Sequence, residues 1–261
     1  MSDFLEAAKK TALKAGKLVL EYYKSRDFTV EDKGEIPFDY LTEADEEAQQ
    51  LIIKELRDRF RDHGFRAEEE PYTRKSNKEY VWIIDPIDGT REFVRRTGQF
   101  CVQIGLTKNG RVIAGVVYFP VTKKLFYAER GKGAFLNDKK IVVSNIDKVE
   151  DMSMGVSSRI SYDEDLIALY DKIKVGNKDI VHSTGRKICL IAEGEYDVTL
   201  FKDYANKEWD FCAPAIILEE AGGKVSGPNG KELVYNREET DYPFPILCSN
   251  GVIHEELLKL L

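Results

Sequence analysis

The feature that most constrains this fold is an apolar strand that runs directly into a pair of aspartates. Residues 82–84 (WII) have the aromatic and β-branched side chains typical of a strand, and residues 85–90 (DPIDGT) follow without a break. Pro86 cannot donate to a ladder of hydrogen bonds, so we expect the strand to stop there. The residues after this segment can begin a helix. The segment therefore predicts two carboxylates, Asp85 and Asp88, at a strand end and beside a helix N-terminus.

This arrangement suits a hard cation and a phosphate group together. Mg²⁺ prefers oxygen ligands and leaves room for water and substrate oxygens, while the exposed N–H groups of a helix N-terminus bind phosphate. Gly89 would let the backbone approach such a ligand closely. The alternative is purely structural, with Asp85 in a turn and Asp88 in a helix cap.

Spacing separates this motif from other phosphate-handling motifs. Phosphatases that form an aspartyl-phosphate show Asp-x-Asp-Gly-Thr, with the acids at i and i+2, whereas Asp85 and Asp88 stand at i and i+3. We therefore expect two metal ligands rather than a nucleophile with its acid–base partner. The P-loop pattern is absent. Gly131-x-Gly133 lacks the third glycine of a dinucleotide-binding fingerprint and is expected to be an ordinary loop.

Three further groups of acids are candidates for the same site. Asp210 begins an apolar helix that ends at Gly222-Gly223, where it is either a helix cap or a third carboxylate of the site. Thr42 and Asp45 are spaced as a variant of the capping box. The run Glu68-Glu69-Glu70 is either a solvated loop or a source of another ligand.

The first part of the chain predicts two amphipathic helices followed by strands. Apolar residues recur at helical spacing in both helices, and Lys108-Asn109-Gly110 is a hairpin signal between two of the strands. The expected elements are a helix over residues 3–24, a loop over 26–40 that contains Gly34 and Pro37, a helix from Thr42 to His63-Gly64, an acidic loop, and strands over 80–84, 100–107, 111–119 and 124–128.

From residue 142 the pattern changes to an alternation of strands and helices, which predicts an α/β arrangement. The expected strands are 152–157, 179–182, 196–201 and 245–248, and the expected helices are 163–174, 186–193, 210–221 and 252–261. Domains average about 150 residues, so 261 residues allow one domain of two lobes. We expect a single domain over residues 1–261, with an N-terminal α+β lobe (1–141) and a C-terminal α/β lobe (142–261) that supplies Asp210.

Composition excludes several classes of protein. Hydrophobic residues make up 43% and charged residues 33%, which is enough apolar material for a large core and excludes a disordered chain. The formal net charge of −7 argues against a nucleic-acid polymer as partner, but it allows a small phosphorylated ligand in a local site. No run approaches the roughly 20 apolar residues of a membrane helix, and we expect no membrane span.

The cysteines and histidines predict neither disulfides nor zinc. The four cysteines are scattered through apolar segments and form no CxxC pair, which is typical of reduced core thiols in a cytoplasmic protein. The three histidines (His63, His182 and His254) are isolated, without the spacing of zinc ligands. The first residues, MSDFLEAAKK, lack the apolar core of a secretory signal.

Four stretches together resemble the inositol monophosphatase superfamily, a group of Mg²⁺-dependent, lithium-sensitive phosphomonoesterases. They occur in the order typical of that family and span nearly the whole chain: TEAD (42–45), AEEE (67–70), WIIDPIDGT (82–90) and EWDFCAPAIILEEAGG (208–223). The resemblance implies a layered αβαβα sandwich with the active site between two lobes. It also implies two or three Mg²⁺ ions, and a monomer or homodimer.

The resemblance assigns a role to each acid. It implies that Asp85 bridges two metal ions, that Ile87 offers its backbone carbonyl, and that Asp88 and Asp210 bind the second metal. Glu68 matches the loop glutamate of the family, and Glu69 is the alternative because Ala67, adjacent to Glu68, replaces the usual glycine. The implied metal ligands are therefore Glu68 or Glu69, Asp85, Ile87, Asp88 and Asp210.

Other residues match the groups that handle water and phosphate. Asp45 and Thr90 match the pair that orients the attacking water. Two metals can polarise that water and stabilise the leaving oxygen of a phosphomonoester, whose hydrolysis is very slow without catalysis. The substrate-binding residues implied by the resemblance are Asp88, Gly89, Thr90, Arg186, Lys187 and Asp210.

Two segments are similar to the 3′(2′),5′-bisphosphate nucleotidase branch of the superfamily. Residues 88–93 (DGTREF) are similar to its DGTKEF, and residues 186–194 (RKICLIAEG) to its lysine followed by CLVAEG. Arg186 or Lys187 could bind the 5′-phosphate of a substrate with two phosphates, although both could also be solvated residues at a helix start. The expected reaction is hydrolysis of adenosine 3′,5′-bisphosphate to AMP and phosphate.

Two alternatives stay open. Inositol-1-monophosphatase or fructose-1,6-bisphosphatase activity would use the same metal chemistry with a different leaving-group pocket. A metal-binding regulatory protein without catalysis would be a different class, but all the acids of the motif set are present, together with Thr90.

Overall fold

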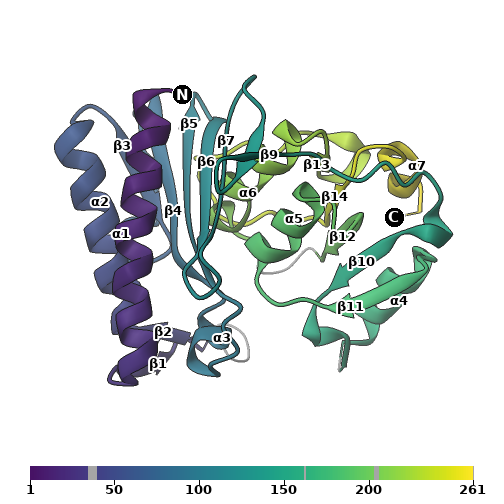
Figure 1. The fold of residues 1–261 in the computed structure, drawn as a ribbon, viewed down its shortest axis with the longest axis horizontal. Coiled ribbons are helices and arrows are strands. Elements are labelled where there is room, and N and C mark those ends of the chain that lie inside the picture. The colour runs from purple at the N-terminus through teal and green to yellow at the C-terminus, as the bar shows by residue number, and fades with distance from the viewer. Residues whose placement is uncertain (35–39, 162, 203–205, 261) are drawn as a thin grey trace.

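Two large sheets and three layers of helices alternate through the molecule (Figure 1). The computed structural model describes residues 1–34, 40–161, 163–202 and 206–260. Helices α1 (Asp3–Ser25) and α2 (Glu43–Arg59) cover the outer face of a seven-stranded sheet. Helices α5 (Thr184–Ala192) and α6 (Glu208–Glu220) lie between that sheet and a five-stranded sheet, whose outer face is covered by α4 (Glu164–Lys172) and α7 (His254–Leu258). This order of layers confirms the αβαβα sandwich.

The seven-stranded sheet has the order β3-β4-β5-β6-β7-β8-β9. The first pair, β3 and β4, is parallel, and all the remaining pairs of neighbouring strands are antiparallel. Its strands are β3 (Gly64–Ala67), β4 (Tyr80–Asp88), β5 (Cys101–Lys108), β6 (Arg111–Phe119), β7 (Lys124–Glu129), β8 (Ala134–Leu136) and β9 (Lys139–Ile141). Sequence analysis predicted the four long strands and missed β3, β8 and β9, which are too short to show a periodic pattern.

The five-stranded sheet has the order β11-β10-β12-β14-β13. Strands β11, β10 and β12 are parallel, while β14 runs antiparallel to both β12 and β13. Its strands are β10 (Ser153–Val156), β11 (Asn177–Ile180), β12 (Val198–Phe201), β13 (Lys224–Ser226) and β14 (Ile246–Ser249). The four expected strands of this region are confirmed, and β13 was missed. The predicted boundary between two lobes at residues 141 and 142 stays a prediction.

Three apolar clusters fill the spaces between the layers. One lies under α1 and α2, where Leu5, Ala12, Val19, Ile52 and Leu56 are buried against the seven-stranded sheet. The second surrounds α6 between the two sheets, and the third lies between the five-stranded sheet and α4 with α7. Burial on both sides of α6 explains why this helix is apolar nearly all round.

The segment between α1 and α2 differs from its prediction as a loop. Strands β1 (Val30–Asp32) and β2 (Tyr40–Thr42) form a small antiparallel pair. Residues 35–39, which include the expected breaker Pro37, lie outside the described residues. Helix α2 ends at Arg59, before the predicted end at His63-Gly64, because Phe60 leaves the helical conformation. No helix among the described residues is long and apolar enough to cross a membrane.

Candidate active site

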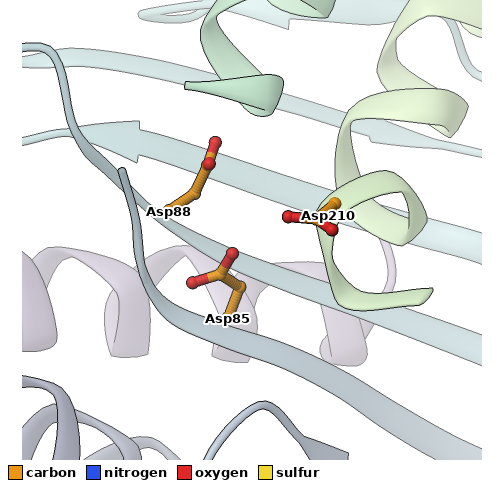
Figure 2. A group of neighbouring side chains, drawn as sticks. All are labelled: Asp85, Asp88 and Asp210. Atoms are coloured by element: carbon orange, nitrogen blue, oxygen red, sulfur yellow. The ribbon is translucent and has the colours of Figure 1, made fainter. Parts of the chain in front are cut away.

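Three carboxylates converge in the space between the seven-stranded sheet and α6. Asp85 and Asp88 come from β4 and Asp210 from the first turn of α6, and Figure 2 shows the three side chains turned toward one another. One carboxylate oxygen of each lies within 4.8 Å of the others. Asp85 and Asp88 are buried, while Asp210 keeps some exposure. The structure therefore brings together the three acids that the sequence motifs proposed as metal ligands.

A bulge in β4 explains how Asp85 and Asp88 reach the same side of the sheet. Residues at i and i+3 of a regular strand point to opposite faces. Here Asp85 pairs with Gln103 and Asp88 with Cys101, so β4 contains one residue more than β5 between the two pairs. The extra residue reverses the alternation and turns both carboxylates to one face. The expectation that Pro86 ends the strand is therefore wrong, because β4 continues through a bulge to Asp88.

Burial and mutual repulsion disfavour the charged form of these acids. Burial raises the pKa of Asp85 well above its usual value, and the charges of Glu68, Asp88, Asp210 and Asp45 raise it further. Burial also raises the pKa of Asp210, again with help from Asp88. The Oδ1 atom of Asp85 is buried and has no hydrogen-bond partner. A divalent cation would relieve both conditions, because it supplies positive charge and accepts carboxylate oxygen as a ligand.

Asp88 is held by the N-terminus of α5. Its Oδ2 accepts hydrogen bonds from Ser183 Oγ at 2.6 Å and from the backbone N–H of Gly185 at 2.6 Å, and its Oδ1 accepts one from the N–H of Thr184 at 3.2 Å. A negative charge is favoured at a helix N-terminus. Asp88 therefore caps α5 across the layer interface, while Gly89 occupies the cap position of the short helix α3 (Thr90–Val94).

Asp45 and Thr90 meet beside this cluster. Thr90 Oγ1 lies 3.2 Å from Asp45 Oδ1 and 2.9 Å from the carbonyl oxygen of Ile87. The other oxygen of Asp45 accepts a hydrogen bond from the N–H of Thr42 at 2.9 Å, which is the predicted capping box of α2. Burial raises the pKa of Asp45 to about 7. Asp45 therefore both caps a helix and contacts a hydroxyl of the site.

Glu68 and Glu69 differ in their surroundings. Glu68 is among the groups that raise the pKa of Asp45, Asp85 and Asp210, so its charge faces the acidic cluster. The backbone of Glu69 is fixed by Gln49, which accepts from its N–H at 2.9 Å and donates to its carbonyl oxygen at 2.7 Å. Burial, followed by the charge of Glu68, raises the pKa of Glu69 to about 8.

Lys33 contacts both glutamates, and the sequence analysis did not identify it. Its Nζ lies 3.2 Å from Glu68 Oε1 and 2.7 Å from Glu69 Oε1. Burial alone would lower the pKa of Lys33, but the two carboxylates outweigh burial and raise it above its usual value. Nothing in the local sequence pattern signals this contact, since Lys33 lies 35 residues before Glu68.

A large cleft adjoins the acidic cluster. Glu68, Glu69 and Asp210 line it, while Asp85 and Asp88 are not among its described lining residues. Its volume is about 1060 Å³, and its wall includes Asp210 and Lys187 together with Lys33, Glu68, Glu69, Thr184, Phe201, Lys202, Lys207 and Trp209. The structure separates the two basic residues that the sequence analysis proposed for substrate binding. Lys187 lines this cleft, whereas Arg186 lines a smaller pocket of about 180 Å³ with Lys124 and Glu193.

The whole chain, residues 1–261, matches the model of the inositol monophosphatase family. The chain belongs to this family. It is 33% identical over 259 residues to a fructose-1,6-bisphosphatase/inositol-1-monophosphatase of Thermotoga maritima, covering 99% of this chain and 96% of the relative. It is 31% identical over 273 residues to an inositol monophosphatase of Dictyostelium discoideum, and the match covers 100% of this chain and 96% of the relative. Its fold is similar to that of the extragenic suppressor protein suhB from Bartonella henselae, with a TM-score of 0.87, 27% identity and coverage of 99% and 98%.

Membership of the inositol monophosphatase family makes the chain a hydrolase of phosphomonoesters, in a family that depends on metal ions, typically Mg²⁺. The residues present fit such an ion. Asp85, Asp88 and Asp210 offer carboxylate oxygens within 4.8 Å of one another, and the buried, unpartnered Oδ1 of Asp85 is explained by a cation. An all-oxygen donor set suits Mg²⁺ rather than a softer metal.

Proposed function

We propose that this inositol monophosphatase family member removes the 3′-phosphate of adenosine 3′,5′-bisphosphate, giving AMP and phosphate. The observation that carries the phosphatase assignment is the convergence of Asp85, Asp88 and Asp210 beside the Asp45–Thr90 contact. The nucleotide assignment depends on Lys187, a cation in the wall of the same cleft.

The proposed metal ligands are the three aspartates, Glu68 and the carbonyl oxygen of Ile87. Glu68 is preferred over Glu69, because Glu68 acts electrostatically on Asp85 and Asp210 while the backbone of Glu69 is held by Gln49. When bound, two or three Mg²⁺ ions would supply the positive charge that polarises the attacking water and stabilises the phosphoryl and leaving oxygens.

Thr90 and Asp45 are proposed to orient the attacking water and to take up its proton. When Asp45 is ionised, Thr90 can donate its hydroxyl proton to Asp45 Oδ1 and accept a hydrogen bond from water with its own oxygen. The carboxylate is held in place by the N–H of Thr42. A carboxyl group with a pKa near 7 is suited to general-base work at neutral pH, because it is partly ionised and still basic.

The remaining substrate contacts are proposed from the first turn of α3 and from α5. Gly89 precedes Thr90 with φ of +91°, and a Cβ at this position would lie 3.0 Å from the carbonyl oxygen of Gln99, so only glycine fits this backbone without strain. We propose that Asp88, Gly89, Thr90 and Asp210 hold the phosphate that is removed, and bound Mg²⁺ would supply the positive charge that offsets repulsion between the carboxylates and the phosphate.

Lys187 is the proposed partner of the second phosphate. Its side chain is largely buried, and its Nζ lies 4.9 Å from the centre of the Phe201 ring, which holds the ammonium against the cleft wall. Arg186 is not proposed for this role, because it lines the other pocket. The cleft, at about 1060 Å³, is large enough for a nucleotide, since ligand pockets commonly measure roughly 300–1000 Å³.

Phosphate release in the presence of Mg²⁺ tests this proposal. We expect the highest kcat/KM for adenosine 3′,5′-bisphosphate among that nucleotide, inositol 1-phosphate and fructose 1,6-bisphosphate. Lys187→Met should raise the KM for adenosine 3′,5′-bisphosphate about tenfold, the effect of losing one charge-assisted contact. It should leave the KM for adenosine 3′-monophosphate unchanged. Arg186→Met is the matched control, and it should change neither KM. If Lys187→Met raised the KM for adenosine 3′,5′-bisphosphate and for adenosine 3′-monophosphate by the same factor, the proposed role of Lys187 would be contradicted.

A second candidate function is hydrolysis of inositol 1-phosphate or fructose 1,6-bisphosphate. It is favoured by the relative from Thermotoga maritima, whose name covers both activities and which is 33% identical over 99% of this chain. A preference for either substrate in the same assay would keep the metal chemistry and reject the nucleotide. No phosphate release from any substrate of a broad Mg²⁺ screen would instead favour a non-catalytic, metal-binding regulator.

The state of the cysteines bears on where the protein is located. The four cysteines are free thiols and buried, as the sequence analysis expected for a cytoplasmic protein. We propose a cytoplasmic enzyme that acts on a small phosphorylated metabolite as a monomer or homodimer, and that is inhibited by lithium.

A further inference from the structure

Arg66 and Glu208 form an ion pair in the interior of the molecule, next to the acidic cluster but outside it. Arg66 comes from β3 and Glu208 is the first residue of α6, and Nη1 of Arg66 lies 3.3 Å from Oε2 of Glu208. Both side chains have 0% exposure. Removing two charges from water costs several kcal/mol per ion, so a fully buried pair is weak evidence for stability on its own. Its presence calls for another explanation.

The contacts of the pair are directional. Glu208 accepts hydrogen bonds from the N–H of Asn236 at 2.6 Å and from the N–H of Arg237 at 2.9 Å, and it contacts Nε of Arg237 at 3.2 Å. Arg66 donates from Nη1 to the carbonyl oxygen of Arg237 and from Nη2 to that of Glu238. The planar guanidinium thereby fixes β3, the N-terminus of α6 and the loop at residues 236–238 relative to one another.

Each member of the pair lies two residues from an acid of the cleft. Arg66 precedes Glu68, and the N–H of Glu68 continues the parallel ladder by donating to the carbonyl oxygen of Ile84 at 3.1 Å. Glu208 precedes Asp210 in the first turn of α6, where Asp210 Oδ2 accepts from the N–H of Lys207 at 2.8 Å. The backbone between each ion and its neighbouring acid is thus held by hydrogen bonds. A shift of either ion would move the acid beside it.

We infer that Arg66 and Glu208 are positioning residues, which hold Glu68 and Asp210 at the separation that metal binding requires. This inference depends on the proposed function, since it takes both acids as ligands. Among the described residues that line the cleft, neither Arg66 nor Glu208 is present. Apolar side chains could pack here in several ways, whereas the hydrogen-bonded ion pair has one geometry. This geometry links the segment that contains Glu68 to the helix that contains Asp210. Residues that orient metal ligands commonly change metal affinity by about 10–100-fold when they are replaced.

The test measures Mg²⁺ binding to the substrate-free protein by calorimetry, together with the melting temperature in chelator. Arg66→Met should weaken Mg²⁺ binding by about tenfold or more. Because this variant leaves the buried Glu208 with Arg237 as its remaining cation, it can also lose stability or fail to fold. The double variant Arg66→Met/Glu208→Leu removes both charges and is expected to fold. It should still bind Mg²⁺ about tenfold more weakly than the original chain, because the link between β3 and α6 is absent.

Arg237→Met is the matched control. It removes a cation from the same carboxylate, but Arg237 belongs to the loop rather than to β3. It should therefore leave Mg²⁺ affinity unchanged. Normal Mg²⁺ binding by the double variant, or equal weakening by Arg237→Met, would overturn the inference and leave the pair a merely structural one. Absence of Mg²⁺ binding by the original chain would instead reject the proposed function itself.

Discussion

The hydroxyl of Thr90 lies 3.2 Å from Oδ1 of Asp45, which joins the first residue of α3 to the first turn of α2. The same oxygen of Thr90 lies 2.9 Å from the carbonyl of Ile87. A hydroxyl has one proton to donate, so it serves either the carbonyl or the carboxylate at a given moment. The ionised form of Asp45 draws that proton toward itself and frees the hydroxyl oxygen to accept from water.

Loss of this contact should lower turnover more than substrate binding. We expect Thr90→Val to reduce kcat by about 10²–10³-fold, while Thr90→Ser, which keeps the hydroxyl, should stay within about tenfold of the original rate. KM should change less than kcat in either variant. Steady-state kinetics at saturating Mg²⁺ check the prediction. Equal rates for the valine and serine variants would exclude a role for the hydroxyl.

The pH profile should report Asp45 directly. Its pKa is raised by burial to about 7, and the base must be ionised to act, so kcat/KM should rise with pH up to about this value. Added Mg²⁺ favours the ionised form and should move the rising limb to lower pH. Asp45→Asn should remove the limb along with most of the activity. A rising limb that survives in Asp45→Asn would assign it to another group.

Much of the site could be predicted from sequence because its residues lie in contiguous motifs. Asp85, Asp88 and Asp210 were identified from a strand end and a helix start, and both elements are present. In contrast, the sequence could not predict which residues of α5 face the cleft. Adjacent residues of a helix point about 100° apart, and the docking of α5 decides which of the two lines the cleft. Lys187 lines it, while Arg186 lines the smaller pocket.

Contacts between distant segments could not be predicted either. Sequence spacing alone would place Asp85 and Asp88 on opposite faces of a regular strand, and the bulge that reunites them depends on pairing with β5. Strand β3 is only four residues long and has the charged Arg66 at its centre, so its pattern did not indicate a buried strand. The partners of the buried Arg66 are distant in sequence: Glu208 of α6 comes 142 positions later, and the carbonyl oxygens of Arg237 and Glu238 come later still.

Asp85→Asn should separate catalysis from stability. We expect turnover to fall by about 10³-fold or more, because the variant loses a carboxylate from the centre of the metal site. Since Asp85 is buried among other acids, the substitution should also raise the melting temperature in chelator. Asp197→Asn is the control, as Asp197 is a buried aspartate outside the lining of the cleft, and it accepts a hydrogen bond from the N–H of Ser153 at 2.7 Å. It should lower the melting temperature and leave activity intact.

Mg²⁺ should stabilise the protein, and more so at neutral than at acidic pH. Burial and the neighbouring acids raise the pKa of Asp85 and of Asp210 well above the usual value, so the stability that these groups contribute to the metal-free protein is present at low pH and is lost as the pH rises. Bound Mg²⁺ replaces the lost protons. Melting curves at about pH 5.5 and pH 7.5, with Mg²⁺ and with chelator, should show the larger Mg²⁺-induced shift at the higher pH. A shift that is the same at both values would argue against buried carboxylates as the ligands.

Ser183 offers a test that separates a hydrogen bond from backbone strain. Its Oγ donates to Asp88 at 2.6 Å, and its φ of +66° lies in the region that favours glycine. Ser183→Ala and Ser183→Gly both remove the hydroxyl and should weaken Mg²⁺ binding by a similar factor of about ten. Ser183→Gly also relieves the strain, which costs about 1 kcal/mol, so it should melt at a higher temperature than Ser183→Ala. If metal affinity instead followed the melting temperature across the two variants, the hydroxyl would have no specific role in holding Asp88.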